Sequence, residues 1–104
     1  MTIVYASSQN FSDETAHNLV LLDFTSTWCE PCKMIDSVLE EIASEMNDTI
    51  KIIKIDLDEN QDIANSFDII GTPTLILLRE GETLGKLIGY QPKKVITDLI
   101  RKHT

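Results

Sequence analysis

The two cysteines of this chain stand two residues apart, in the segment Trp-Cys-Glu-Pro-Cys-Lys that covers residues 28–33. An apolar run precedes them and favours a strand, and an amphipathic run follows them and favours a helix. A cysteine pair in the first turn of a helix can close a small disulfide ring and reopen it by thiol exchange. The segment therefore predicts redox chemistry at Cys29 and Cys32.

Cys29 is the predicted nucleophile of the pair. The unpaired N–H groups and the positive dipole end of a helix N-terminus stabilise a thiolate, which lowers the pKa of a thiol placed there. Cys32 would then resolve the mixed disulfide by attacking Cys29 and releasing the reduced substrate. Pro31 suits the first helical turn, where no backbone N–H is missed. Because the apolar stripe of the helix extends back to Cys32, we expect Cys32 to be shielded and Cys29 to be accessible.

Two other interpretations of the cysteine pair are an inert buried pair and half of a zinc site. Zinc in structural sites takes about four ligands. The two histidines, His17 and His103, stand in unrelated elements at poor spacing. The sequence therefore favours redox chemistry, with no metal.

Asp23 stands inside the apolar run Leu-Val-Leu-Leu-Asp-Phe of residues 19–24. Burying an ionised carboxylate is unfavourable, so desolvation should raise the pKa of Asp23. Such an acid, one strand length before the cysteines, could relay a proton to or from Cys32. The alternative is an aspartate at the strand end that faces water, but its large apolar neighbours favour burial. Lys54, in a second apolar run, lies either close to Asp23, where it would moderate the shift, or on the surface.

Pro73 follows Gly71 and Thr72 and precedes an apolar run, so its peptide bond is a candidate for the cis form. A cis turn would present the backbone of Thr72 to the cysteines, free to pair with an extended substrate segment. Trp28, directly before the predicted nucleophile, is interpreted as a contact platform in preference to a core residue. These residues predict a substrate-binding surface around the cysteine pair.

Hydrophobic periodicity and turn signals divide the chain into strands and helices. Strands are expected over residues 3–6, 19–25, 50–56, 74–79 and 83–88, the last two joined by a short loop at residues 80–82. Helices are expected over residues 8–17, from residue 31 to about 46, over residues 61–67, and from about residue 92 onward. The order β-α-β-α-β-α-β-β-α is typical of an α/β domain with a mixed sheet and helices on both faces.

Some local expectations accompany this order. Asp58 and Gln61 resemble a capping box at the start of the short helix over residues 61–67. The last helix is expected to bury Val95 together with Ile96 and Ile100. A right-handed crossover through the cysteine-bearing helix would place the cysteines at the carboxyl end of a central strand, where open α/β sheets usually carry their chemistry.

The chain has 104 residues, of which 42% are hydrophobic, and this fits a single domain over residues 1–104. Its formal charge of −8 argues against nucleic acid and against an anionic membrane surface as partners, because both attract clustered Lys and Arg. Two cysteines are too few for a secreted disulfide scaffold. With no charged-then-apolar leader and no apolar run near the ~18 residues of a membrane span, we expect a soluble cytoplasmic protein.

The chain resembles the thioredoxin family over nearly its full length. The motifs that carry the resemblance are Leu21-Leu22-Asp23-Phe24, Trp28-Cys29-x-Pro31-Cys32-Lys33, Lys54-Ile55-Asp56, Gly71-Thr72-Pro73-Thr74, and Gly81 with Gly89 in the hairpin region. The cysteine motif alone is moderately specific. The Gly-x-Pro-Thr motif further along the chain and the order of the elements make the match specific.

The resemblance implies the thioredoxin fold, a central mixed five-stranded sheet flanked by four helices on both faces. It implies a monomeric protein-disulfide reductase with no bound cofactor, whose redox-active Cys29–Cys32 disulfide is recharged from NADPH by a flavoprotein, thioredoxin reductase. Cys29 would attack disulfides of client proteins, Cys32 would resolve the mixed disulfide, and Asp23 would be the buried acid. The implied substrate groove, with a cis-proline, is lined by Trp28, Thr72, Pro73 and Gly89.

The chain departs from the family pattern close to the cysteines. Glu30 replaces the glycine usual between them, Thr25-Ser26 stand where an aromatic residue and alanine are common, and Asp36-Ser37 replace an Ala-Pro that usually kinks the helix. Glu30 places a negative charge near the Cys29 thiolate. We therefore expect a pKa of Cys29 somewhat above the family norm and a couple that is, if anything, more reducing. Loss of the proline should straighten the helix.

Two alternatives to a general reductase stay open. One is a specialised thioredoxin-like exchanger, such as an isomerase-like oxidant or a protein with one dedicated client. Those roles more often go with a histidine between the cysteines or with an export signal. The other is a non-catalytic binding module that uses the fold as a scaffold with an idle cysteine pair. A glutaredoxin is less favoured, because a Cys-Pro-Tyr-Cys type of motif is absent.

Overall fold

The computed structural model describes residues 3–104. Its strands are β1 (Ile3–Tyr5), β2 (Val20–Thr25), β3 (Lys51–Asp56), β4 (Thr74–Arg79) and β5 (Glu82–Ile88). Its helices are α1 (Phe11–Glu14), α2 (Glu30–Glu45), α3 (Gln61–Ser66) and α4 (Lys93–Lys102). The predicted order of strands and helices is confirmed.

The five strands form one sheet in the order β1-β3-β2-β4-β5. β3 pairs in parallel with β1 and β2, whereas β4 pairs antiparallel with β2 and β5. The sheet is therefore mixed, as predicted. β2 is the central strand, and all of its residues except Thr25 are buried, which explains why its sequence is apolar on both faces.

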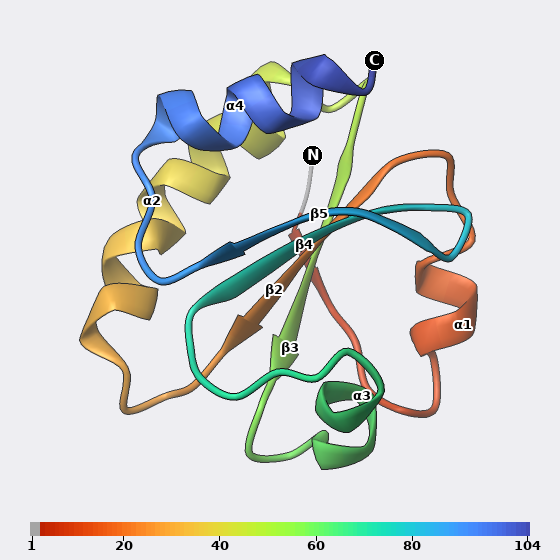
Figure 1. Ribbon diagram of the computed structural model, residues 1–104, viewed down its shortest axis with the longest axis vertical. Coiled ribbons are helices and arrows are strands. Elements are labelled where there is room, and N and C mark those ends of the chain that lie inside the picture. The colour runs from red at the N-terminus through yellow and green to blue at the C-terminus, as the bar shows by residue number, and fades with distance from the viewer. Residues whose placement is uncertain (1–2) are drawn as a thin grey trace.

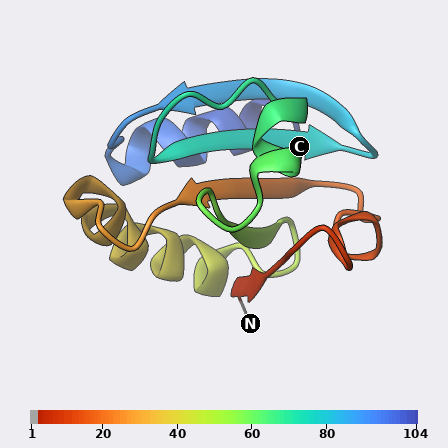
Figure 2. The same ribbon diagram turned by 90° about the horizontal axis from the view of Figure 1, so that it is seen from below.

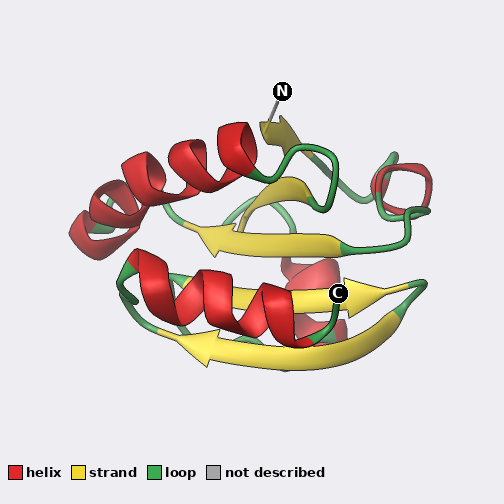
Figure 3. Ribbon diagram, turned by 90° about the horizontal axis from the view of Figure 1, so that it is seen from above, coloured by secondary structure: helices red, strands yellow, loops and turns green. Residues whose placement is uncertain are grey.

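Helices cover both faces of the sheet (Figure 1). α2 and α4 lie on one face, the α2/α4 face, where they pack against strand residues such as Leu21 and Ile52. α1 and α3 lie on the other, the α1/α3 face, toward which Leu22 and Ile53 point. Seen from below, α3 lies in front of the strands (Figure 2), and seen from above, α4 does (Figure 3). Alternate residues of each strand therefore point to opposite faces of the sheet and pack in two separate apolar layers.

β1 and β5 form the two edges of the sheet. Among the described residues, β1 covers three, Ile3–Tyr5. β5 is largely exposed, with the charged side chains of Glu82 and Lys86 in solvent. Its pairing with β4 shifts register between Leu77 and Leu78. The outer edge of the sheet is thus irregular in pairing as well as charged.

The turn between β4 and β5 is shorter than predicted. Arg79 pairs with Glu82, so only Glu80 and Gly81 connect the strands, whereas the sequence predicts a loop over residues 80–82. Both turn residues have positive φ, 49° at Glu80 and 88° at Gly81. Two-residue hairpin loops favour this backbone conformation, and glycine adopts it without a steric penalty.

The first helix is much shorter than predicted, since only Phe11–Glu14 is helical within residues 8–17. Polar side chains near both of its ends bond to the local backbone. The Asn10 side chain accepts a hydrogen bond from the backbone N–H of Ser7 at 2.8 Å, and the Thr15 hydroxyl donates to the Phe11 carbonyl at 2.8 Å. Such bonds compete with the helix for the backbone, and Phe11 alone supplies little apolar surface to hold a longer one.

Two predicted side-chain positions are wrong. Val95 is 38% exposed, because it lies one residue, and so about 100° around the helix, from the buried Ile96. Asp58 does not cap α3, whose N-cap residue is Asn60 and has no side-chain cap. The carboxylate of Asp58 instead accepts a hydrogen bond from the indole N–H of Trp28, at 3.0 Å.

Candidate active site

The cysteine pair stands at the start of α2, just after the carboxyl end of β2. Cys29 is the N-cap residue of the helix, with extended backbone, and Pro31 lies in the first turn. The Sγ of Cys29 accepts a hydrogen bond from the backbone N–H of Cys32, at 3.1 Å. The N–H groups of a first turn have no helical partner, and they carry the positive end of the helix dipole. This position stabilises negative charge on Cys29.

The two cysteines form a disulfide, with their Cα atoms 5.3 Å apart. Cys29 is 4% exposed and Cys32 is 1% exposed. Cys32 is shielded, as predicted, but the prediction that Cys29 is accessible is wrong for the bonded pair, in which both cysteines are buried. Each sulfur covers part of the surface of the other in the bonded pair, which explains part of this difference.

Asp23 is fully buried in β2, so the alternative of a water-facing aspartate is wrong. Its neighbours on the adjacent strands are Lys54 of β3 and Leu75 of β4. Neither carboxyl oxygen forms a hydrogen bond with any of residues 3–104. Burial is the main reason that the pKa of Asp23 rises to about 7; the charge of Lys54 lowers the pKa and that of Asp36 raises it. This carboxyl group therefore exchanges its proton near neutral pH.

Lys54 is buried beside Asp23, so the alternative of a surface lysine is wrong. Its ammonium group pairs with Asp36 of α2, with Nζ 2.6 Å from Oδ1, and lies 5.8 Å from the centre of the Tyr5 ring. Burial acts to lower the pKa of Lys54. The hydrogen bond and charge of Asp36, with help from Tyr5 and Asp23, more than offset burial and raise this pKa above its usual value. Lys54 is therefore held as a cation.

The sequence does not predict the partnership of Lys54 with Asp36. In the sequence, Asp36 stands out only as a departure from the family pattern. The available signal is its spacing, because a residue four positions after Cys32 lies on the same side of the helix as Cys32. Cys32, Asp36 and Lys54 line a small cleft of about 220 Å³.

The segment around Pro73 lies at the same end of the sheet as the cysteines. The Thr72–Pro73 peptide bond is cis, in agreement with the sequence-based expectation. The Thr72 hydroxyl donates to the hydroxyl of Ser26, which precedes the cysteines, at 3.3 Å. The Pro73 carbonyl accepts a hydrogen bond from the backbone N–H of Gly89 at 2.8 Å. Three of the four predicted groove residues are thus brought together.

Trp28, the fourth groove residue, is 69% exposed, which rules out the core alternative. The indole ring is held by the bond to Asp58 described above. Ile70, in the segment before the cis-proline turn, and Ile88, at the end of β5, are also strongly exposed. The sequence does not predict these two isoleucines as site residues. The sequence could have indicated them, because Ile70 is an apolar residue in an irregular segment and Ile88 stands at the end of an edge strand. At neither place does the core require an apolar side chain.

Glu30 points into solvent, and its side chain is 78% exposed. Its carboxylate pairs with the ammonium group of Lys33, with Oε2 and Nζ 3.2 Å apart. The negative charge that the sequence places beside Cys29 is therefore partly offset by Lys33 and screened by water.

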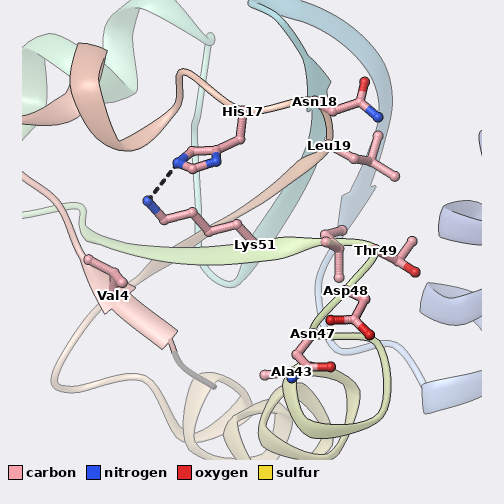
Figure 4. Close-up of a pocket in the computed structure, with 10 residues that line it drawn as sticks. Val4, His17, Asn18, Leu19, Ala43, Asn47, Asp48, Thr49 and Lys51 are labelled. Atoms are coloured by element: carbon pink, nitrogen blue, oxygen red, sulfur yellow. Dashed lines mark hydrogen bonds between the residues drawn. The ribbon is translucent and has the colours of Figure 1, made fainter.

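A second hollow, of about 430 Å³, lies at the amino ends of β2 and β3 (Figure 4). Within it the Nζ of Lys51 lies 3.2 Å from Nε2 of His17, and it also pairs with Glu14 at 2.5 Å. Because the cysteines follow the carboxyl end of β2, this hollow belongs to the opposite end of the molecule.

Residues 3–104 contain no group of three or more His, Cys, Asp or Glu side chains placed to hold a metal ion. Over the same residues, none of the helices combines the length and the apolar character that crossing a bilayer requires.

The family model named Thioredoxin matches residues 2–102 of the chain. The chain belongs to the thioredoxin family. Thioredoxin of Bacillus subtilis (strain 168) is 48% identical over 103 residues, 99% of either chain. Thioredoxin of Staphylococcus saprophyticus is 43% identical over the same shares. The solved structure of a mutant thioredoxin from Halobacterium salinarum NRC-1 superposes with a TM-score of 0.91 at 35% identity, covering 98% of this chain and 90% of that one.

These matches confirm the predicted thioredoxin fold and give the chemistry of the cysteine pair its context. This member of the thioredoxin family is a thiol–disulfide oxidoreductase of the protein-disulfide reductase class. The Cys29–Cys32 disulfide is the group in this chain that fits such an activity.

Proposed function

We propose that Cys29 is the attacking thiolate and Cys32 the resolving thiol in the reduction of protein disulfides. The thiolate of Cys29 bonds to one sulfur of the client disulfide and displaces the other client sulfur as a thiolate. Cys32, deprotonated, then attacks Cys29 and releases the second client sulfur. The client gains two electrons, and the cysteine pair is left as a disulfide. The observation that carries this assignment is the position of Cys29 as N-cap of α2, with its sulfur accepting the Cys32 N–H.

Asp23 serves this cycle as the buried acid and base for Cys32. Asp23 shares the α2/α4 face with Leu21, because side chains two residues apart in a strand point to the same side. Helix α2, which begins with the cysteine pair, covers that face. With a pKa of about 7, the Asp23 carboxyl group is partly ionised near neutral pH, so it can take the proton of the Cys32 thiol and return it later. The positive charge of Lys54, on the neighbouring strand β3, favours the ionised form of Asp23. Pro31 favours the backbone conformation of the first turn of α2.

The client segment binds across Trp28, Thr72, Pro73 and Gly89. Exposed apolar surface next to a reactive group favours binding of a polypeptide, and the irregular segment that precedes β4 offers backbone groups with which an extended client can pair. Ile70 and Ile88 widen the apolar part of this surface.

Electrons reach the pair from NADPH through a thioredoxin reductase, and the protein works as a cytoplasmic monomer with a single domain over residues 1–104. A reducing compartment keeps such a dithiol charged for use. The net charge of −8 fits partners that are neither nucleic acid nor an anionic membrane surface.

The test is reduction of insulin disulfides by dithiothreitol, followed as turbidity, with the wild type, Cys29→Ser and Cys32→Ser. We expect catalysis by the wild type and only the uncatalysed rate with Cys29→Ser. When the reduced Cys32→Ser variant is freed of dithiothreitol and then mixed with insulin, we expect it to accumulate a mixed disulfide that mass spectrometry detects. Full turnover by Cys29→Ser would overturn the assignment of the nucleophile, and a silent wild type would favour the scaffold alternative.

A second assay replaces dithiothreitol with NADPH and a bacterial thioredoxin reductase. Oxidation of NADPH, seen at its absorbance band, is expected only when wild type and insulin are both present. Activity with dithiothreitol but none with the reductase would instead favour an exchanger with a dedicated client and a separate electron donor.

A further inference from the structure

Three ionisable side chains from three elements meet on the α2/α4 face. Asp23 comes from β2, Lys54 from the neighbouring strand β3, and Asp36 from the helix that covers them. Asp36 stands where the family pattern has an alanine, so a member that follows the pattern has no carboxylate here. The buried lysine of this chain therefore has two carboxyl groups within reach.

The lysine is bound to one of these carboxyl groups and not to the other. Its Nζ lies 2.6 Å from Oδ1 of Asp36, whereas neither oxygen of Asp23 has a hydrogen-bond partner in the part of the chain that the structure describes. Asp36 keeps about a third of its side chain in solvent, and Asp23 is fully buried. An ammonium group held by the outer carboxylate is drawn away from the inner one.

We propose that Asp36 is a positioning residue that sets the protonation of Asp23 through its hold on Lys54. When Asp36 binds the ammonium group, Asp23 loses the direct ion pair that would otherwise keep it ionised. The charge of Asp36 also disfavours a second negative charge nearby. Both effects keep a proton on Asp23 to a higher pH. This inference rests on the proposed role of Asp23 as the acid and base for Cys32.

The cleft of about 220 Å³ gives the arrangement access to water, because Cys32, Asp36 and Lys54 all line it. Leu75 of β4 covers Asp23 from the other side without a charge. The titratable and charged groups that face this region are Asp23 from β2, Lys54 and Asp56 from β3, Tyr5 from β1, and Cys32, Lys33, Asp36 and Glu40 from α2. Within this set, Asp36 is the group that touches the Lys54 ammonium directly.

The test measures the pKa of the Asp23 carboxyl group by carbon-13 NMR in wild type and Asp36→Asn, for the oxidised and the reduced protein. Asparagine keeps the shape of the side chain and removes its charge. We expect the pKa of Asp23 to fall by roughly one unit in the variant, since Lys54 becomes free to pair with it. The pH at which insulin reduction is half-maximal should move downward with it. An unchanged pKa would overturn the proposal.

A double-mutant cycle with Lys54→Met separates action through the lysine from direct repulsion. In the Lys54→Met background, Asp36→Asn should lower the pKa of Asp23 much less than it does in the wild type. An equal shift in both backgrounds would show that Asp36 acts by repulsion alone and would overturn the positioning role. Glu45→Gln is the matched control: it removes one acidic charge from α2 and one ion pair, with Lys93, further along the helix. It should leave the pKa of Asp23 unchanged.

The NMR measurement needs no catalysis, so its outcome is independent of the insulin assay. If Cys29→Ser kept full turnover while Asp36→Asn shifted the pKa of Asp23, the proposed cysteine roles would fail and the inference about Asp36 would stand. If the cysteine variants behaved as expected and the pKa did not move, the reverse would hold. Asp36→Ala, which restores the usual family residue, should shift the pKa in the same direction as Asp36→Asn.

Discussion

The two faces of the sheet differ in what they bury. The α1/α3 face is packed with apolar side chains, among them Phe24, whose ring lies 5.9 Å from that of Phe67, which in turn lies 5.9 Å from Phe11. The α2/α4 face has an apolar layer of similar composition, but it also holds Asp23 and Lys54. Within residues 3–104 these two are the buried charged side chains. One face serves mainly to hold the sheet together, and the other gives up some stability to supply a proton-exchanging group.

Loss of the largest fully buried side chain of the α1/α3 face should have the largest effect on stability. Phe24→Ala removes a fully buried ring from the centre of that face. We expect the free energy of unfolding to fall by about 4 kcal/mol, measured by urea denaturation, because a cavity replaces the ring. Phe24→Leu is the control and should cost about 1 kcal/mol. The insulin-reducing activity of the folded fraction should persist. If Phe24→Ala lowered the free energy of unfolding by less than about 1 kcal/mol, the view that the α1/α3 face mainly stabilises the sheet would be wrong.

On the α2/α4 face, a substitution should instead stabilise the protein. The folded protein keeps the Asp23 proton up to a pH of about 7, whereas the unfolded chain loses it near the ordinary carboxyl pKa. Burial of Asp23 is thus tolerated at low pH, and stability falls as pH rises from about 4 to about 7 and is then constant. Asp23→Asn has no such proton to lose.

We expect Asp23→Asn to raise the free energy of unfolding by about 3 kcal/mol at pH 8 and to lower it by about 1 kcal/mol at pH 4. Burying the amide without a partner costs about 1 kcal/mol at either pH, so the gain at pH 8 stays below the roughly 4 kcal/mol that three pKa units represent. Urea denaturation across this pH range measures it. A gain that did not depend on pH would show that the charge of Asp23 is not its cause. The same variant should slow insulin reduction.

The smallest effect is expected where a charge stands in water. Glu30→Gly removes the carboxylate beside Cys29, and we expect the pKa of the Cys29 thiol to fall slightly, by less than about half a unit. Lys33 and solvent already screen that carboxylate. The thiolate absorbance near 240 nm, followed against pH in the reduced protein, measures it. Glu30→Gln separates the charge from the change in backbone freedom, and an equal or higher pKa in both variants would reject the effect of Glu30.

The sequence was sufficient for the parts of the fold that depend on local pattern. The apolar run around Asp23 predicted a central strand with a buried acid, and the cysteine spacing with Pro31 predicted a helix start. What it did not predict depends on side chains from distant parts of the chain. The pair between Lys54 and Asp36 and the bond between Trp28 and Asp58 join elements whose relative placement follows from packing.

The same limit explains the errors at the ends of elements. α1 is cut short by hydrogen bonds of polar side chains that compete with helical ones, and periodicity does not register such competition. Val95 lies at the edge of an apolar stripe, where one residue of rotation decides between core and solvent.

The outer edges of the sheet bear on how the protein behaves when it is concentrated. Sheets from separate molecules join edge to edge where long, regular strands present unpaired N–H and C=O groups. Here the described part of β1 is three residues long, and β5 has an irregular register and two exposed charges, Glu82 and Lys86. The β5 edge of the sheet therefore resists edge-to-edge growth into aggregates or fibrils, which favours a dispersed protein at high concentration.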